Sequence, residues 1–293
     1  MKPINLLINP FTWIIAIIFV IAACGDKTMD TMDQKLQSRS ISEMEWEKLA
    51  AKRIYFGHQS VGHNIIDGIV TIMKSNPAIR LNIRETKDVS AFNNGVFAHS
   101  PNGENGKPKS KIDAFVKTMD SGLAKRIDSA FFKFCYVDFN KDTDISDLFR
   151  YYSMAMDAMK KKYPEVIFLH MTVPLTTEGE LFGIKTRLKE QVKMIMGRET
   201  ELQQSIDANI KRNEFNILLR KKYGSRYIID LEQFESTNPD GALYTGAKGG
   251  VKHNLMVPAY TVMPCFATTL SMASWSPAGS MRTPSLVFSS ATR

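Results

Sequence analysis

The fold is decided by the stretch Arg53-Ile-Tyr-Phe-Gly-His-Gln-Ser-Val-Gly-His-Asn-Ile-Ile-Asp-Gly68. Its first four residues, Arg53 to Phe56, read as a short apolar strand. Gly57 to Ser60 form a polar step of turn-forming residues, and from Val61 the apolar residues recur at helical spacing. The stretch therefore predicts a strand, a tight turn and a helix.

Ser60 lies in the predicted turn. Free N–H groups at the start of a helix can stabilise an anion, and enzymes with a serine nucleophile often place it at a strand-to-helix turn. Serine is also a preferred N-cap residue. The stretch alone therefore allows two roles for Ser60, a nucleophile or a helix cap.

Charge and ligand spacing exclude several classes of function. The net charge is +8, but residues 24–240 contain 33 Lys and Arg residues against all 30 Asp and Glu residues. The chain has no basic stretch with interleaved aromatic residues and no zinc-type ligand spacing. We expect no nucleic-acid partner, no metal and no cofactor.

The N-terminus resembles the signal of a bacterial lipoprotein. Lys2 precedes an apolar run, residues 11–23, that is shorter than the roughly 20 residues of a membrane span. Ile21-Ala-Ala-Cys24 resembles a lipobox, which implies removal of residues 1–23 and lipidation of Cys24. A plain signal peptide with an incidental Cys24 is the alternative. The resemblance places the protein in the cell envelope, anchored to a membrane and facing the periplasm or the exterior.

The polar residues 24–41 predict a flexible tether. Ser42 and Glu45 have the spacing of a capping box, so the folded domain is expected over residues 42–260. Residues 261–293 read as an atypical tail that is disordered or poorly packed. Residues 178–205 form an insertion, either a substrate-selecting lid or a solvated helix face.

Strands and helices alternate along the domain. The expected strands are Arg53–Phe56, Ile79–Glu85, Ala130–Val137, Val166–Val173 and Tyr227–Leu231. The expected helices are Val61–Lys74, Lys111–Lys125, Ile145–Lys162 and Ile206–Tyr223. This order predicts an α/β fold with a parallel sheet that helices cover on both faces. Functional sites in such sheets lie beyond the carboxyl ends of the strands.

Two further polar segments follow predicted strands. Asn140 could donate a hydrogen bond to an oxyanion, or it could belong to a turn or cap before the next helix. In the loop Phe97–Ser110, an N–H group near Gly103 could be a second donor, or the loop could be ordinary surface. These segments are the candidate partners of Ser60.

This order of parts resembles the SGNH hydrolases, a superfamily of GDSL-like esterases and lipases. Phe56-Gly-His-Gln-Ser60-Val-Gly62 resembles their serine block with one extra residue. Gly103, or alternatively Gly106, matches their glycine block, and Asn140 matches the asparagine of a third block whose glycine and aspartate are missing here. The resemblance implies a flavodoxin-like, three-layer α/β/α sandwich with about five parallel strands, and catalysis by Ser60, Gly103 and Asn140.

The fourth SGNH block, an Asp-x-x-His motif near the C-terminus, is absent. The 53 residues from Gly241 to Arg293 contain no Asp or Glu. We hypothesise that the reading frame changes near Thr261. Translation of the DNA in the other two frames tests this, because a lost Asp-x-x-His motif or amphipathic helix should reappear in one of them.

The five histidines offer no obvious replacement for the missing base. His253 reads as a surface-loop residue, His170 as a core residue and His63 as a packing or surface residue. His58 is expected to line the pocket, and nothing in the sequence fixes the direction of His99. The cysteines offer no clear chemistry either: Cys135 lies in a predicted buried strand, and its spacing to Cys265 does not support a disulfide.

The expected function is that of a membrane-anchored serine hydrolase of the esterase or acetylesterase type. Its substrates would be acyl or acetyl esters of a glycan or lipid outside the cytoplasm, with weak or no turnover because the base is missing. The alternative is a non-catalytic lipoprotein that binds glycan or lipid in the same cleft.

Overall fold

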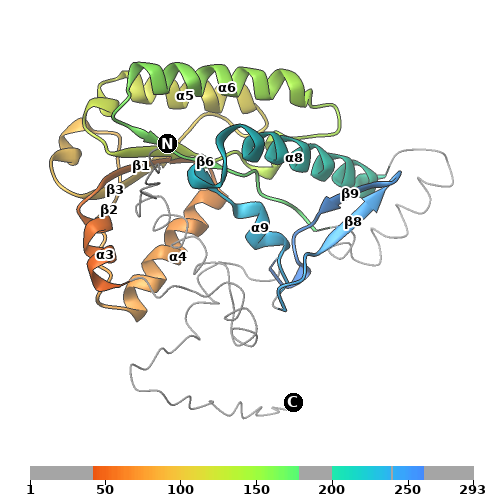
Figure 1. Cartoon of the computed structure of the whole chain (residues 1–293), viewed down its shortest axis with the longest axis horizontal. Helices are drawn as coiled ribbons and strands as arrows, with labels where there is room; N and C mark the ends of the chain where they lie inside the picture. The colour runs from red at the N-terminus through yellow and green to blue at the C-terminus, as the bar shows by residue number, and fades with distance from the viewer. Residues whose placement is uncertain (1–41, 178–199, 239, 261–293) are drawn as a thin grey trace, which may run out of the picture.

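A computed structural model describes residues 42–177, 200–238 and 240–260 (Figure 1). The predicted signal peptide, the tether, Cys24, the tail and most of the insertion at 178–205 lie outside the described residues. Among the helices of these ranges, none is both long and apolar enough to cross a membrane.

The centre of the fold is a sheet of five parallel strands in the order β2-β3-β1-β4-β5. The strands are β1 (Arg53–His58), β2 (Ile83–Glu85), β3 (Val96–Pro101), β4 (Ser129–Phe132) and β5 (Ile167–Phe168). A parallel pair, β6 (His170–Met171) and β7 (Ile228–Ile229), continues the sheet, because the Leu169 N–H between β5 and β6 still donates to the Ala130 carbonyl at 3.0 Å. The central position of β1 places the turn after it near the middle of the sheet edge.

Helices cover both faces of the sheet (Figure 1). The helices of one face are α5 (Pro108–Asp120), α6 (Ile145–Lys162) and α8 (Glu201–Tyr223), and those of the other are α3 (Glu43–Ala50), α4 (Val61–Ser75) and α9 (Leu231–Ser236). Side chains of β1 alternate between the two cores: Tyr55 packs with the first set, and Ile54 and Phe56 pack with the second. The predicted three-layer α/β/α sandwich is confirmed.

The helix starts follow from local capping chemistry. Ser42 and Glu45 form the predicted capping box at the start of α3. The Asp144 side chain accepts a hydrogen bond from the Asp147 N–H and begins α6 at Ile145, as expected. Helix α8 begins at Glu201, five residues before the predicted start, because Thr200 caps it.

Several strands differ in detail from the predicted ones. The second predicted strand shortens to Ile83–Glu85, and residues 97–101 of the predicted loop belong to β3. The third apolar run leaves the sheet after Phe132. The hairpin of β8 (Thr245–Lys248) and β9 (Val251–Asn254) was not predicted, since neither strand shows apolar alternation.

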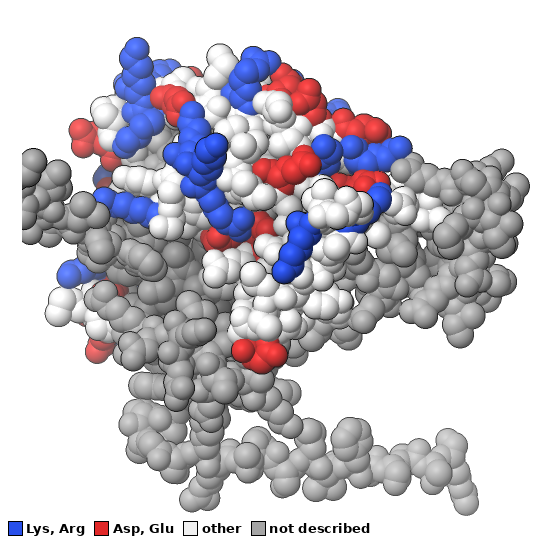
Figure 2. All heavy atoms as spheres, turned by 45° about the vertical axis from the view of Figure 1, so that its right-hand side comes forward, with Lys and Arg blue, Asp and Glu red and all other residues white. Residues whose placement is uncertain are grey.

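Charges of both signs share the surface. On the face in Figure 2, acidic side chains lie between the basic ones. The described residues also form exposed ion pairs, such as Lys109 with Asp147 and Lys162 with Asp120.

Candidate active site

The turn between β1 and α4 holds Ser60 in a strained conformation. Its φ of 27° and ψ of −93° make it the one non-glycine residue with positive φ in the described ranges. The N–H groups of Gly62 and His63 donate to the carbonyls of Gln59 and Ser60, both at 2.8 Å, and these bonds close the turn. The Ser60 side chain is exposed and makes no capping hydrogen bond to the helix, so the cap role is not observed.

The loop that carries Gly103 lies beside this turn. The Gln59 side chain donates to the Gly103 carbonyl at 2.6 Å, and the Asn102 N–H donates to the His58 carbonyl at 2.8 Å. Gly103 has a φ of 64°, and a Cβ atom there would lie 2.6 Å from the Cα of Lys111, so this close approach requires glycine. Within the described residues the N–H groups of Ser60 and Gly103 donate no hydrogen bond.

Cys135, not Asn140, is the residue after β4 that contacts Ser60. Its Sγ lies 3.9 Å from the Ser60 Oγ. The cysteine is buried, as expected, but it follows the strand instead of lying inside it, and Cys265 lies outside the described residues. The sequence offered no signal for this contact, because the apolar run through Val137 hides the end of β4 at Phe132.

Asn140 lies in an exposed turn before α6. Its Oδ1 accepts hydrogen bonds from the Asp142 N–H at 2.9 Å and the Thr143 hydroxyl at 3.3 Å. These are the contacts of a turn residue. No hydrogen bond joins Asn140 to Ser60 in the described ranges, and its role at an oxyanion stays a prediction.

A buried ion pair ties the Gly103 loop to the Cys135 loop. Lys111 Nζ lies 2.6 Å from the Asp138 carboxylate, and both side chains are fully buried. Asp138 also accepts hydrogen bonds from the N–H groups of Cys135 at 2.6 Å and Gly106 at 2.8 Å. One carboxylate therefore fixes both loops next to the Ser60 turn.

A second buried lysine lies beside Cys135. Lys133 donates from Nζ to the Phe134 carbonyl at 3.1 Å, and the same Nζ lies 3.7 Å from the Cys135 Sγ. Burial lowers the pKa of Lys133. Burial also raises the pKa of Glu235 to about 8, and the charge of Glu235 acts on Lys133. Both shifts favour the uncharged forms of the two groups.

His58, His63 and His99 gather on the α4 side of the sheet. His58 Nε2 lies 3.0 Å from His99 Nδ1, and the His58 and His63 rings meet edge to face at 4.7 Å. Burial lowers the pKa of His58 to about 3 and also lowers that of His99, so both imidazoles are neutral. His58 ends β1 next to the turn but is fully buried, so its predicted place in the pocket wall stays a prediction, and His99 reaches the turn only through its contact with His58.

The two other histidines lie elsewhere. His170 is buried, accepts or donates a 2.7 Å hydrogen bond with the Tyr152 hydroxyl and stacks on Tyr223, so the prediction of a core histidine is confirmed. His253 was predicted in a surface loop, but it is buried in β9. No histidine forms a hydrogen bond with Ser60 in the described part of the chain.

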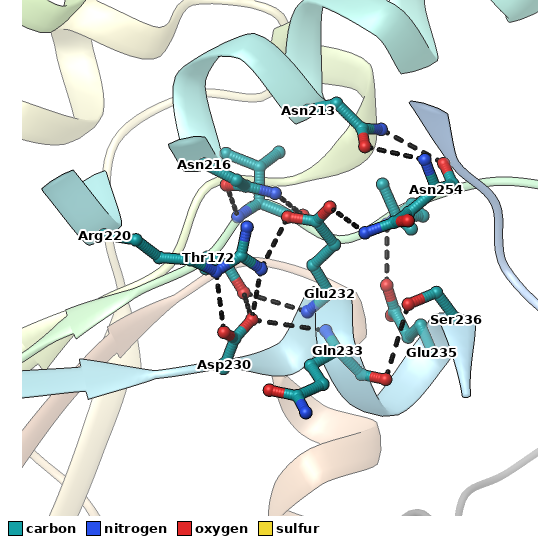
Figure 3. Close-up of polar contacts among 12 residues, drawn as sticks. Thr172, Asn213, Asn216, Arg220, Asp230, Glu232, Gln233, Glu235, Ser236 and Asn254 are labelled. Atoms are coloured by element: carbon teal, nitrogen blue, oxygen red, sulfur yellow. Dashed lines mark hydrogen bonds and ion pairs between the residues drawn. The ribbon is translucent and has the colours of Figure 1, made fainter. Parts of the chain in front are cut away.

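A polar network closes the edge of the sheet beyond β6 and β7 (Figure 3). Arg220 of α8 bonds to Asp230 and Glu232, at 2.6 and 2.8 Å. Glu232 also accepts from the Asn254 side chain, and this bond holds β9 against α9. The buried carboxylates of this region serve structure, because each is engaged by a cation, an amide or a backbone N–H.

Comparisons with known proteins add little to this geometry. No family model matches the chain, and no curated protein matches it. One solved structure, from Streptococcus pneumonia and provisionally described as a platelet activating factor, aligns over 85% of this chain and 100% of its own, with 11% identity and a TM-score of 0.36.

Proposed function

We propose that this chain is an SGNH-like serine hydrolase of the esterase or acetylesterase type, with Ser60 as its nucleophile. The backbone of Ser60 carries the proposal. Its exposed hydroxyl is held on a strained turn between the central strand and a helix, and hydrolases of several folds hold a nucleophilic serine on such a turn. A serine that only capped the helix would use its side chain for that purpose, and this one does not.

The surrounding groups suit the attack on an ester. Ser60 Oγ would add to the carbonyl carbon, and the resulting oxyanion would accept hydrogen bonds from the N–H groups of Ser60 and Gly103. The first turn of α4 adds its positive dipole end at the same place. The Nδ2 amide group of Asn140 is the proposed third donor, because the turn engages the Oδ1 atom of this side chain.

Among the described residues, the hydroxyl proton of Ser60 has no strong acceptor nearby. Its hydroxyl contacts the Cys135 sulfur at 3.9 Å, a long and weak contact, and none of the five histidines bonds to it. General-base catalysis typically contributes about 10²–10⁴-fold to the rate. We therefore expect slow turnover, best seen with activated esters whose leaving groups need no protonation.

Activity on activated esters tests the proposal. The full chain should hydrolyse p-nitrophenyl acetate slowly and react with a fluorophosphonate probe, and Ser60→Ala should abolish both. Ser75→Ala is the matched control, because Ser75 is an exposed serine at the other end of the same helix. Equal activity in Ser60→Ala and the parent chain would remove the hydrolase proposal.

The alternative is a non-catalytic protein that binds an ester-bearing glycan or lipid in the same place. The described part of the chain holds no base beside Ser60, and this favours the alternative. In that case the parent chain would show neither hydrolysis nor probe labelling, and Ser60→Ala would leave glycan or lipid binding unchanged.

We further propose that Cys24 anchors the protein to a membrane of the cell envelope through a lipid. The lipobox-like Ile21-Ala-Ala-Cys24 supports this. Metabolic labelling with a palmitate analogue should mark the parent chain and leave Cys24→Ser unmarked. Equal labelling of both chains would exclude anchoring at this residue.

A further inference from the structure

Three histidines that are distant in the sequence converge next to the Ser60 turn. His58 ends β1, His99 lies on the neighbouring strand β3, and His63 lies in the first turn of α4. Parallel pairing sets Phe56 opposite His99, so the two strands bring His58 and His99 to the same face of the sheet. One ring nitrogen from each histidine lies within 4.8 Å of the other two.

These distances suit a tetrahedral metal ion. Zinc binds histidine nitrogens at about 2.0–2.1 Å, which separates two tetrahedral ligands by about 3.3 Å. His58 Nε2 and His99 Nδ1 are already 3.0 Å apart. The third ligand, His63, is exposed, so its side chain can rotate to complete the set. Three histidines with a fourth position open to solvent form the ligand set of many catalytic zinc ions.

The backbone around His58 holds its ring in place for this role. A Cβ atom on Gly62 would lie 2.2 Å from the His58 ring, so α4 approaches His58 closely because residue 62 has no side chain. The ring is fully buried between the helix and the sheet. A ligand fixed in this way loses little conformational entropy when it binds a metal.

Two exposed carboxylates belong to the elements that carry or flank the cluster. Asp67 lies one helical turn after His63, and Glu85 lies on β2, which pairs with β3 opposite His99. Both act electrostatically on His99. Carboxylates near metal-binding histidines commonly orient the rings and increase their basicity.

We propose that His58, His63 and His99 bind one transition-metal ion of the zinc class. Imidazole ligands suit zinc, copper, nickel and iron, and a compact set of three histidine nitrogens is a ligand set of catalytic zinc ions. The ion would join β1, β3 and α4 around the turn that carries Ser60. This site does not depend on the hydrolase activity of Ser60.

Metal titration of the full chain tests the site. The protein, prepared without a histidine tag and stripped with a chelator, is titrated with zinc chloride against a chromogenic chelator. One zinc ion should bind per chain and raise the melting temperature. His63→Ala and His99→Ala should each weaken binding by about 100-fold or more, since even partners of metal ligands contribute about 10–100-fold.

Asn64→Ala is the matched control, because Asn64 is the neighbour of His63 on the same helix and offers no imidazole. It should bind zinc as the parent chain does. Substitution with Co²⁺ gives a second measurement: the visible absorption of a tetrahedral site should appear in the parent chain and disappear in His63→Ala, whose exposed position keeps the fold intact. Zinc affinity that stays within two-fold in His63→Ala, or no binding in the parent chain, would overturn the proposal.

Discussion

At φ 27° and ψ −93°, the Ser60 backbone lies in a region that residues with a Cβ atom rarely adopt. Such conformations cost about 1–3 kcal/mol and persist where the surrounding structure imposes them. Here the conformation is held by the hydrogen bonds from the N–H groups of Gly62 and His63 to the carbonyls of Gln59 and Ser60. The hydrogen bond from the Gln59 side chain to the Gly103 carbonyl also holds it. The strain is stored at the residue whose hydroxyl we assign to chemistry.

The strain predicts that two substitutions of Ser60 differ in their effect on stability. Ser60→Gly removes the Cβ atom and relieves the conformation, whereas Ser60→Ala keeps it. We expect Ser60→Gly to be more stable than Ser60→Ala by about 1 kcal/mol, although both lack the hydroxyl. Urea unfolding measures the difference, and a more stable Ser60→Ala would show that residue 60 is not strained.

The residues of the site differ in how far the sequence reveals them. Ser60 could be found because its signals are local: an apolar strand, a polar turn and a helical period lie within 16 residues. The contact of Cys135 with Ser60 could not, because it depends on where β4 leaves the sheet. The meeting of His58 with His99 depends on the register between β1 and β3, which no local pattern specifies.

Among the elements, the loops after β3 and β4 are fixed by one buried carboxylate. Asp138 bonds to Lys111, Cys135 and Gly106, and the first two of these groups are buried. Removing one partner of a buried ion pair leaves an uncompensated charge in a medium of low polarity. The arrangement of the two loops around Ser60 therefore rests on this pair.

Substitution of Asp138 should be far more costly than loss of an exposed pair. Asp138→Asn removes the charge that Lys111 faces, and we expect it to lower the free energy of unfolding by about 3–5 kcal/mol. Glu104→Gln is the control, since Glu104 pairs with Lys107 on the same loop at 65% and 66% exposure and should cost less than about 1 kcal/mol. Similar losses in the two variants, measured by urea unfolding, would contradict this assignment.

Helices were predicted better than strands for a physical reason. The starts of α3 and α6 depend on side chains within a few residues, such as Ser42 with Glu45 and Asp144 with Asp147. The sequence predicts a loop over most of strand β3, Val-Phe-Ala-His-Ser-Pro101. The pairing with β1 and β2 that stabilises this strand leaves no local pattern in the sequence. Serine, histidine and proline are not typical strand residues, and the partner strands lie elsewhere in the sequence.

At the scale of the whole molecule, polar groups of α8, α9 and β9 cover the edge of the sheet beyond β6 and β7. Helix α9 places Glu232 and Glu235 in the interior, where Glu232 meets Arg220 and Asn254 (Figure 3). Glu235 accepts a hydrogen bond from the Leu175 N–H at 2.6 Å. The covering of this edge is therefore sensitive to the protonation of buried carboxyls.

Glu235 should make the stability of the protein fall as the pH rises. Burial raises its pKa from 4.5 to about 8, so the folded protein retains a proton there that the unfolded chain releases above about pH 4.5. The folded state binds more protons between these two values, so the free energy of unfolding decreases with pH in this window. The stabilisation is complete below about pH 4.5 and is lost once the pH exceeds the folded pKa.

Glu235→Gln isolates this contribution, because glutamine keeps the shape and the acceptor for the Leu175 N–H but does not titrate. Other groups change stability with pH in both proteins, so the difference between their urea unfolding free energies reports residue 235 alone. We expect the stability of Glu235→Gln relative to the parent chain to be higher at about pH 9 than at about pH 5, by a few kcal/mol. A difference that is constant across this range would mean that Glu235 is ionised in the folded protein, paired with Lys133 and Arg212, whose charges lower its pKa. In that case the edge of the sheet would be closed by an ionic cluster and not by a neutral carboxyl.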